Sequence, residues 1–422
     1  MPDPKESRQE LHARTIRIRM YRIGFGDCFL VSFPLPESKK GADTHAHVLI
    51  DCGVHPKGKI GTMEAVVDNI AEVTDRKLSI VIASHAHADH ISGFDTCADK
   101  FAAFDVGEVW LPWTWNLRDK EAAKLQKKHA ALATALSQHL AAAPKSKAKT
   151  AIENLTGNAH AIALLNDGLG VKGKAKYLTA GDELENTPVP NLSARILGPP
   201  RSVEFLGKMD PPASQHYLRL GDGGVTQPPV RPFQARWQVN RDAEEMAAIA
   251  LPRKEEKELE TRLGSSFEDL AFSLDSAKNN ESVVALFVFR GQYLLFPGDA
   301  QYGNWIWWLD HQAPEEILPR ITFFKVAHHG SVNATPKRAV EGMSAGKFAA
   351  MVSTQSSPWP SIPRVPLMQV LDEKTQQRIV RSDWLQVDGA PTPSPETAPS
   401  KPKNLPEGFQ QGRLWFDYLI PC

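Results

Sequence analysis

The stretch Ser84–His90, with the sequence SHAHADH, carries three imidazoles and one carboxylate within six residues. Neutral histidine nitrogens and carboxylate oxygens are the ligands that zinc and other first-row divalent cations take in proteins. The stretch follows an apolar β-branched segment, SIVIA, whose predicted strand would hold these side chains in place. A lone histidine beside an apolar segment is usually a core residue. Four potential ligands separated by small alanines favour a metal site instead.

Two later segments bring the same residue types to the ends of predicted strands. Asp299 follows an apolar run in LLFPGDA, and His328 and His329 follow another in FFKVAHHGS. Gly-Asp is common in turns, so Asp299 alone carries little weight. Its order and strand context beside the other motifs favour a role in the same site.

The elements around these motifs are predicted to form two clusters of strands, each with helices. Thr15–Met20 alternates apolar and polar residues, which is typical of a half-buried strand. Thr62 is predicted to cap a helix. Two such clusters predict an α/β protein with two sheets packed face to face and helices outside. Further strands are predicted at Cys28–Phe33, His47–Asp51, Ser79–Ser84, Glu281–Phe289, Gln292–Phe296, Ile321–Val326, Phe348–Ser353 and Arg413–Ile420.

The composition is that of an ordinary globular protein of 422 residues, with 42% hydrophobic and 23% charged residues. Forty-nine basic and 49 acidic side chains give a net charge of zero, which excludes a histone-like protein that coats nucleic acid through its overall field. Four cysteines without a CxxC pair exclude a disulfide scaffold and a cysteine-rich zinc finger. The charged N-terminus and strand-length apolar runs predict neither a signal peptide nor a membrane span, so a cytoplasmic location is expected.

The charges are unevenly distributed along the chain. Residues 116–176 are predicted to be a helical basic insertion, in which Arg118–Lys176 holds eleven Lys or Arg against four acidic residues. Residues 231–278 are predicted to be an acidic insertion, in which Arg241–Asp275 holds five basic against ten acidic residues. Residues 388–410 read as a Pro-rich linker before a final strand. Residues 1–422 are otherwise expected to form one domain.

Together the motifs resemble the metallo-β-lactamase superfamily, with HxHxDH after a strand, an aspartate ending an earlier strand in VLIDCG, a later GD and a terminal HHGS. YRIGFGDCFLVSF is also similar to the GQGD segment of the branch that contains the hydrolase domain of DNA-uptake channel proteins and the choline-binding teichoic-acid esterases. This resemblance implies a four-layer αββα sandwich that carries the helical and acidic insertions. It covers Met20–Phe33, Leu49–Gly93, Ser282–Ala300 and Phe323–Thr335.

The resemblance also implies two divalent metal ions, zinc or, as an alternative, manganese. His85 and His87 would bind the first ion, and Asp89 and His90 the second. Asp299 would bridge both. The third histidine that the wider superfamily gives to the first ion has no clear counterpart in this sequence. The residues weighed for that place are His129, His139, His160, His216 and Asp182.

Supporting roles follow from the same resemblance. His328 is expected to bind the second ion because it follows the strand directly, with His329 as a second-shell or proton-transfer group. Asp51 is expected to orient the stretch Ser84–His90, called the histidine loop from here on, by hydrogen bonding. Such residues behind a metal ligand fix its orientation. Asp27 would either cap the glycine-rich turn or reach the histidine loop. The residues expected to take part in catalysis are Asp89, His329 and Asp51.

The expected activity is metal-dependent hydrolysis by a hydroxide that bridges two ions. A phosphodiesterase, in particular a nuclease, is favoured because the basic insertion would suit a polyanion. A hydrolase of a small ester, lactone, β-lactam or phosphocholine-type substrate is the alternative, since tryptophans near the motifs would hold a quaternary ammonium. A third reading is a non-catalytic metal-bound module that docks a protein partner through its charged insertions. The tryptophans concerned are Trp110, Trp113, Trp115, Trp305, Trp307 and Trp308.

Overall fold

The computed structural model describes residues 14–36, 44–56, 58, 60–141, 158–217, 277–355, 361–384 and 404–422. Residues 231–276 of the predicted acidic insertion lie outside this part of the chain. Residues 388–403 of the predicted Pro-rich linker do so as well.

The first sheet has eight strands in the order β14-β15-β1-β2-β3-β4-β5-β6. From β3 to β6 neighbouring strands are parallel, whereas β14, β15, β1, β2 and β3 pair antiparallel. Its strands are β1 (Thr15–Tyr21), β2 (Cys28–Pro34), β3 (His45–Cys52), β4 (Lys77–Ile82), β5 (Asp105–Pro112), β6 (Lys174–Leu178), β14 (Phe409–Gln411) and β15 (Trp415–Pro421).

The second sheet has seven strands in the order β13-β12-β11-β10-β9-β8-β7. Strands β10, β11, β12 and β13 are parallel to one another, and β9 joins β10 in an antiparallel hairpin. Positive φ angles at Arg290 and Gly291 confirm the predicted tight turn of that hairpin. The strands are β7 (Glu183–Leu184), β8 (Leu192–Gly198), β9 (Val284–Phe289), β10 (Gln292–Phe296), β11 (Ile321–Lys325), β12 (Ala349–Val352) and β13 (Ile379–Arg381).

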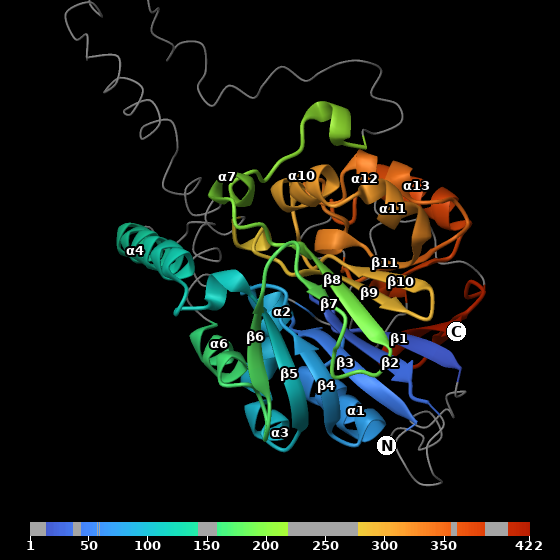
Figure 1. Ribbon diagram of the computed structural model, residues 1–422, viewed down its shortest axis with the longest axis horizontal. Helices are drawn as coiled ribbons and strands as arrows, with labels where there is room; N and C mark the ends of the chain where they lie inside the picture. Colours follow the sequence, from blue (N-terminus) through green and yellow to red (C-terminus); the bar gives the residue numbers. More distant parts are fainter. Residues whose placement is uncertain are drawn as a thin grey trace, which may run out of the picture.

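The two sheets pack face to face between two layers of helices, which confirms the predicted αββα sandwich (Figure 1). Apolar side chains from both sheets, such as Ile18 of β1 and Phe287 of β9, form the central core. The first helical layer contains α1 (Met63–Thr74), α2 (Ala88–Thr96), α3 (Ala98–Phe101) and α6 (Ala159–Asn166). The second contains α10 (Tyr302–His311), α11 (Pro314–Ile317), α12 (Lys337–Gly342) and α13 (Val365–Thr375).

Two elements near the metal motifs, α1 and β1, can be compared with their sequence predictions. Thr62 caps α1 as predicted, since its hydroxyl accepts a hydrogen bond of 3.3 Å from the Ala65 amide. Strand β1 alternates as predicted but is not half-buried, because its polar face is covered too. Arg19 on that face is 1% exposed and donates from Nε and an Nη atom to both carboxylate oxygens of Asp417 on β15, at 2.7 and 2.8 Å. This buried pair ties the first strand to the last.

The predicted basic insertion is smaller than its expected bounds of 116–176. Helix α4 (Lys120–Ala141) extends away from the sheets (Figure 1), and residues 142–157 lie outside the described chain. Residues 159–166 instead form α6, whose Leu165 packs in the first helical layer, and residues 174–178 form the edge strand β6. Short strand β6 escapes sequence analysis because lysines alternate along an edge that needs only one apolar face.

Candidate metal centre

The predicted metal motifs meet at one edge of the sandwich. Asp51 lies at the carboxyl end of β3, and the histidine loop follows the carboxyl end of the parallel strand β4. In the other sheet, Asp299 follows β10, and His328 and His329 follow the parallel strand β11. Carboxyl ends of parallel strands meet at the same edge of a sheet, so both sheets deliver polar side chains to one place.

Asp51 holds the histidine loop from behind. One of its carboxylate oxygens accepts from the Ser84 amide at 2.7 Å, and the other lies 2.7 Å from both the Ser84 hydroxyl and Nδ1 of His90. Asp51 adopts a left-handed backbone with φ of 55°, a conformation that aspartate tolerates better than most residues. Donation from Nδ1 of His90 to a carboxylate turns its Nε2 lone pair toward the opposite sheet.

This atom belongs to a cluster of four side chains, those of Asp89, His90, Asp299 and His329, which come from three segments of the chain. Oδ2 of Asp299 lies 3.0 Å from Nε2 of His90 and 3.3 Å from Nε2 of His329. Oδ2 of Asp89 lies 3.3 Å from the same His329 atom, and one donor atom from each of the four residues falls within 4.8 Å of the others. Around a zinc ion with bonds of 2.0–2.1 Å, neighbouring tetrahedral ligands are about 3.3 Å apart. The donor set and its spacing therefore fit a divalent cation.

His85 and His87 present a second convergent pair. Nε2 of His85 lies 3.0 Å from Nδ1 of His87, and both side chains are buried. Nδ1 of His85 lies 3.1 Å from the Ser84 hydroxyl, so the same serine orients this histidine too. Two imidazole nitrogens at this separation suit one edge of a metal coordination sphere.

The two histidines of the AHHGS motif differ in a way that the sequence does not reveal. His329 is fully buried and its Nδ1 donates to the Ser353 carbonyl at 2.8 Å, which turns Nε2 into the cluster. The His328 side chain is 18% exposed, its Nδ1 lies 3.1 Å from the Asn333 amide oxygen, and its Nε2 is 3.9 Å from Asp299. The geometry thus brings His329 into the four-residue cluster, whereas we expected His328 to be the ligand.

The positive φ angles at both residues explain this difference. His328 and His329 have φ of 46° and 54°, so the chain turns sharply directly after β11. As a consequence, the His328 side chain points toward solvent and the His329 side chain points into the cluster. A strand-end rule based on sequence order alone assumes an extended backbone at this point.

His328 and His329 also differ in pKa, because their electrostatic surroundings differ. Burial lowers the pKa of His329, but the carboxylates of Asp299, Asp89 and Asp27 together outweigh burial and raise this pKa to about 10. Burial dominates for His328 and lowers its pKa to about 4. At His90 burial is likewise the largest single effect, but the carboxylates of Asp299, Asp51 and Asp27 together outweigh it and hold the pKa well above its ordinary value. A divalent cation bound there would displace these protons, and the same carboxylates would favour it.

The glycine-rich segment between β1 and β2 also reaches the centre. The Asp27 amide donates to the Asp89 carbonyl at 2.8 Å, and its carboxylate is 1% exposed and contacts Lys325. A Cβ atom on Gly26 would lie 2.7 Å from the Asp89 carbonyl oxygen, so only glycine permits this close approach. Of the two expectations for Asp27, the structure shows the one in which it reaches the histidine loop.

Three supporting residues escaped sequence analysis. Ser84 contacts Asp51 and His85, and the Asn158 side chain donates to the Ala86 carbonyl at 2.8 Å, between the first two histidines. Lys325 places its ammonium against Asp299. A signal for Lys325 was present, because it is a single charge in the apolar strand ITFFK. Asn158 has no such signal, since its position depends on how the insertion returns.

None of the residues weighed for the missing histidine joins the cluster within the described side chains. His129 contacts Glu281, His160 contacts Asp95, and His216 contacts the Pro211 carbonyl. Asp182 instead accepts from the Thr179 amide at 2.9 Å within its turn. The side chain of His139 lies outside the described part of the chain.

The tryptophans near the motifs are mostly core residues rather than pocket walls. Trp110 lies between the sheets, Trp305 and Trp308 pack beneath the second helical layer, and all three are fully buried. Trp113 and Trp115 are also buried, and Trp307 stacks on His311. The expected aromatic pocket for a quaternary ammonium is therefore not formed by these side chains.

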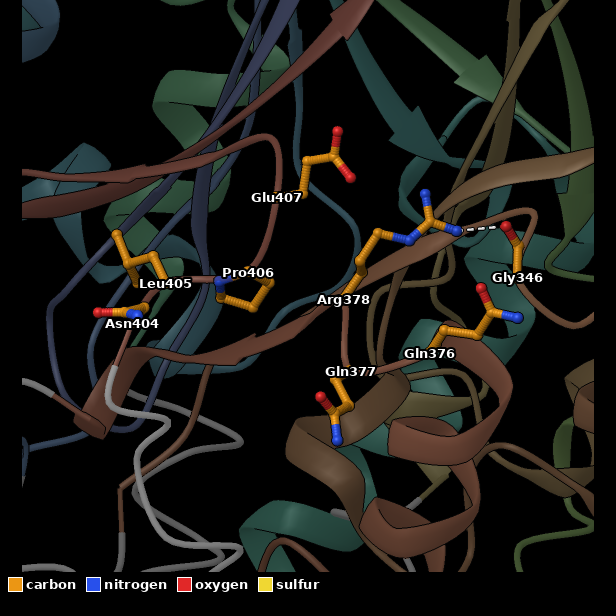
Figure 2. Close-up of a pocket in the computed structure, with 8 residues that line it drawn as sticks. All are labelled: Gly346, Gln376, Gln377, Arg378, Asn404, Leu405, Pro406 and Glu407. Atoms are coloured by element: carbon orange, nitrogen blue, oxygen red, sulfur yellow. Dashed lines mark hydrogen bonds between the residues drawn. The ribbon is translucent and has the colours of Figure 1, made fainter.

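A surface cavity of about 520 Å³ lies elsewhere, between the second sheet and the segment 404–407 that precedes β14 (Figure 2). Its lining includes Gly346, which precedes β12, and Arg378, which precedes β13, and the Arg378 guanidinium donates to the Gly346 carbonyl. These are the amino ends of parallel strands. The cavity is thus at the edge of the sheet opposite to the metal motifs, and it plays no part in the candidate centre.

Comparison with known families supports the resemblance in part. Residues 41–103, which include Asp51 and the histidine loop, match the family described as Metallo-beta-lactamase superfamily. No curated protein matches the chain. The match supports the superfamily, and with the clustered donors it indicates a metal-dependent hydrolase that binds divalent ions. In the described residues, we find no helix with the length and apolarity to span a membrane.

Proposed function

We propose that the protein is a metal-dependent phosphodiesterase, with a nucleic acid as the favoured substrate. The observation that carries this proposal is the convergence of Asp89, His90, Asp299 and His329 in one buried cluster beside His85 and His87. Divalent ions bound there would supply Lewis acidity toward water and toward a phosphoryl oxygen. Zinc is the favoured ion and manganese the alternative.

The chain's own residues would divide the remaining work. Asp51 and Ser84 hold the histidine loop in place, and the Ser353 carbonyl fixes the tautomer of His329. We assign His329, rather than His328, as the ligand. His328, which is more exposed and 3.9 Å from Asp299, is the proposed proton-transfer group.

The preference for a polyanion rests on where the basic helix begins and ends. Residues 113–119 lead into α4 from the carboxyl end of β5, which lies at the same edge as the histidine loop. The chain returns at Asn158, whose side chain binds the Ala86 carbonyl within that loop. Lys124, Lys127 and Lys128 are exposed on α4. A strand of nucleic acid held by these lysines would lie next to the metal centre.

Two other functions compete with this one. A hydrolase of a small ester, lactone or phosphocholine-type substrate loses its main support, because the tryptophans invoked for it are mostly buried in the core. A non-catalytic module that docks a protein partner would not require so many buried ligands in one place. The phosphodiesterase therefore remains the favoured proposal.

The purified protein is expected to bind close to two Mn²⁺ or Zn²⁺ ions and to cleave bis-p-nitrophenyl phosphate. Metal content and p-nitrophenolate release, with and without EDTA, measure both properties. Cleavage of a lactone or choline ester by a metal-loaded protein that leaves all phosphodiesters intact would favour the small-substrate hydrolase. Failure to bind either ion after reconstitution would contradict the metal centre.

Changing Lys124, Lys127 and Lys128 to glutamine is expected to weaken binding of single-stranded nucleic acid at least about tenfold. It should also reduce the salt slope by about 2, because each phosphate contact on a single strand contributes about 0.7. Binding isotherms at several salt concentrations measure both effects. A matched control changes Lys77, Lys172 and Lys347, exposed lysines that precede or begin strands at the opposite edge. Equal losses in the two triple variants would refute the role of α4.

A further inference from the structure

A lysine ammonium is buried where the two sheets meet the metal centre. Lys325 is the last residue of β11 and its side chain is 2% exposed. It lies on the same face of the strand as Phe323, whose ring packs in the core between the sheets. The apolar layer between the sheets therefore ends in a positive charge at the candidate site. A buried ammonium is costly unless opposite charges and acceptors surround it.

Lys325 finds such partners in both sheets. Its ammonium donates to the Gly298 carbonyl at 2.8 Å and lies 3.3 Å from Oδ1 of Asp299, both beside β10 of the second sheet. It also forms an ion pair with Asp27, which comes from the loop between β1 and β2 of the first sheet. One side chain thus connects the two halves of the centre.

The contact leaves the two oxygens of Asp299 with different roles. Oδ1 faces Lys325, whereas Oδ2 faces Nε2 of His90 and His329. Asp27, Asp51 and His90 also come within 4.8 Å of one another. In that group, however, the Asp27 carboxylate already contacts Lys325, and the Asp51 carboxylate already accepts hydrogen bonds from Ser84 and His90. The ammonium therefore takes the cation position beside Asp27.

Lys325 also contributes to the net charge of the centre. The centre holds four carboxylates, those of Asp27, Asp51, Asp89 and Asp299, and this one ammonium, so it carries three net negative charges when its histidines are neutral. Removing either Lys325 or Asp27 changes that net charge by one without removing any proposed metal ligand. The two changes act in opposite directions.

We propose that Lys325 is a resident cation of the centre, which joins the sheets through Asp27 and Asp299 and limits how strongly the centre binds divalent metal ions. This inference rests on the proposed metal site. Lys325 and Asp27 are positioning residues in it, because neither offers an atom to the metal. Metal affinity should consequently follow the net charge of the centre when these two residues are changed.

The test compares wild type, two single variants and the double variant, which differ in net charge. Their Mn²⁺ and Zn²⁺ affinities are measured by competition against a fluorescent chelator. Lys325→Met adds one net negative charge and is expected to lower the dissociation constant at least about tenfold. Asp27→Asn removes one and is expected to raise it at least about tenfold. A unit charge and a divalent ion about 6 Å apart interact by such a factor even at the dielectric constant of water. The double variant restores the wild-type charge and should stay within about threefold of wild type.

A purely structural role predicts a different pattern. If both single variants weaken metal binding and the double variant weakens it further, the resident-cation proposal is overturned. Phe323→Leu, on the same face of β11, is the matched control, and it should lower the melting temperature without changing the affinity. Lys325→Arg keeps the charge and provides a second test if Lys325→Met does not fold. Its affinity should stay within about threefold of wild type, and a tenfold change would count against the proposal.

The melting temperature of the metal-free protein separates this inference from the proposed function. In EDTA, Lys325→Met removes the ammonium that contacts two buried carboxylates and should lose more than about 5 °C, since breaking a buried ion pair is strongly destabilising. Wild-type protein that binds no metal ion would overturn the proposed function, while this loss would still reveal the connection between the sheets. A loss below about 2 °C would overturn the connection itself.

Discussion

Asp299→Ala is expected to lower kcat/KM for bis-p-nitrophenyl phosphate at least about 1,000-fold. Oδ2 of Asp299 is the atom on which the cluster converges, at 3.0 Å from His90 and 3.3 Å from His329. Its loss would remove from the centre a carboxylate that would hold the proposed ions. Metal ions contribute several kcal/mol to the stabilisation of such transition states, and each factor of ten in rate corresponds to about 1.4 kcal/mol. Metal content, measured on the same samples, should fall with activity.

Asp182→Ala provides the control for this experiment. Asp182 also follows a glycine at a turn, but its carboxylate accepts from the Thr179 amide away from the centre. Its replacement should change kcat/KM less than about twofold. Full activity in Asp299→Ala, or an equal loss in both variants, would contradict the proposed position of the metal centre.

The second large effect is expected at the paired histidines and distinguishes their roles. His329→Ala should remove about one bound metal ion and lower kcat/KM at least about 1,000-fold, because Nε2 of His329 contacts both Asp89 and Asp299. His328→Ala should keep both ions and lower kcat about 100-fold, the lower range for a proton-transfer group. Metal content separates the two variants even where their activities are similar.

The reverse pattern would restore the assignment made from sequence order. If His328→Ala loses the ion and His329→Ala keeps it, His328 is the ligand. A useful control is Asn333→Ala, since the Asn333 amide oxygen lies 3.1 Å from Nδ1 of His328, which is outside the four-residue cluster. This variant should reduce kcat modestly and leave the metal content unchanged.

Some residues of the candidate site can be placed from the sequence pattern, and others cannot. His85, His87, Asp89 and His90 lie within six residues, at the end of a loop and in the first turn of α2, so their proximity follows from spacing alone. The positions of Asp51 and Asp299 could be predicted because each follows a recognisable apolar strand. For His328 and His329, by contrast, two left-handed residues reverse the directions that an extended chain would give. Backbone conformation at a single turn is a tertiary property, since packing around Ser353 and Asp299 selects it.

By itself the sequence determined two face-to-face sheets with helices outside, the histidine loop and the order in which the other motifs follow it along the chain. These features depend on local periodicity and on strands long enough to show it. Only the tertiary structure decided that Lys325 meets Asp27, that Asn158 supports the histidine loop, and that residues 159–178 belong to the sandwich. Each of these joins segments far apart in the chain. Their energies depend on burial and charge at the junction of two sheets, which neighbouring residues along the sequence do not encode.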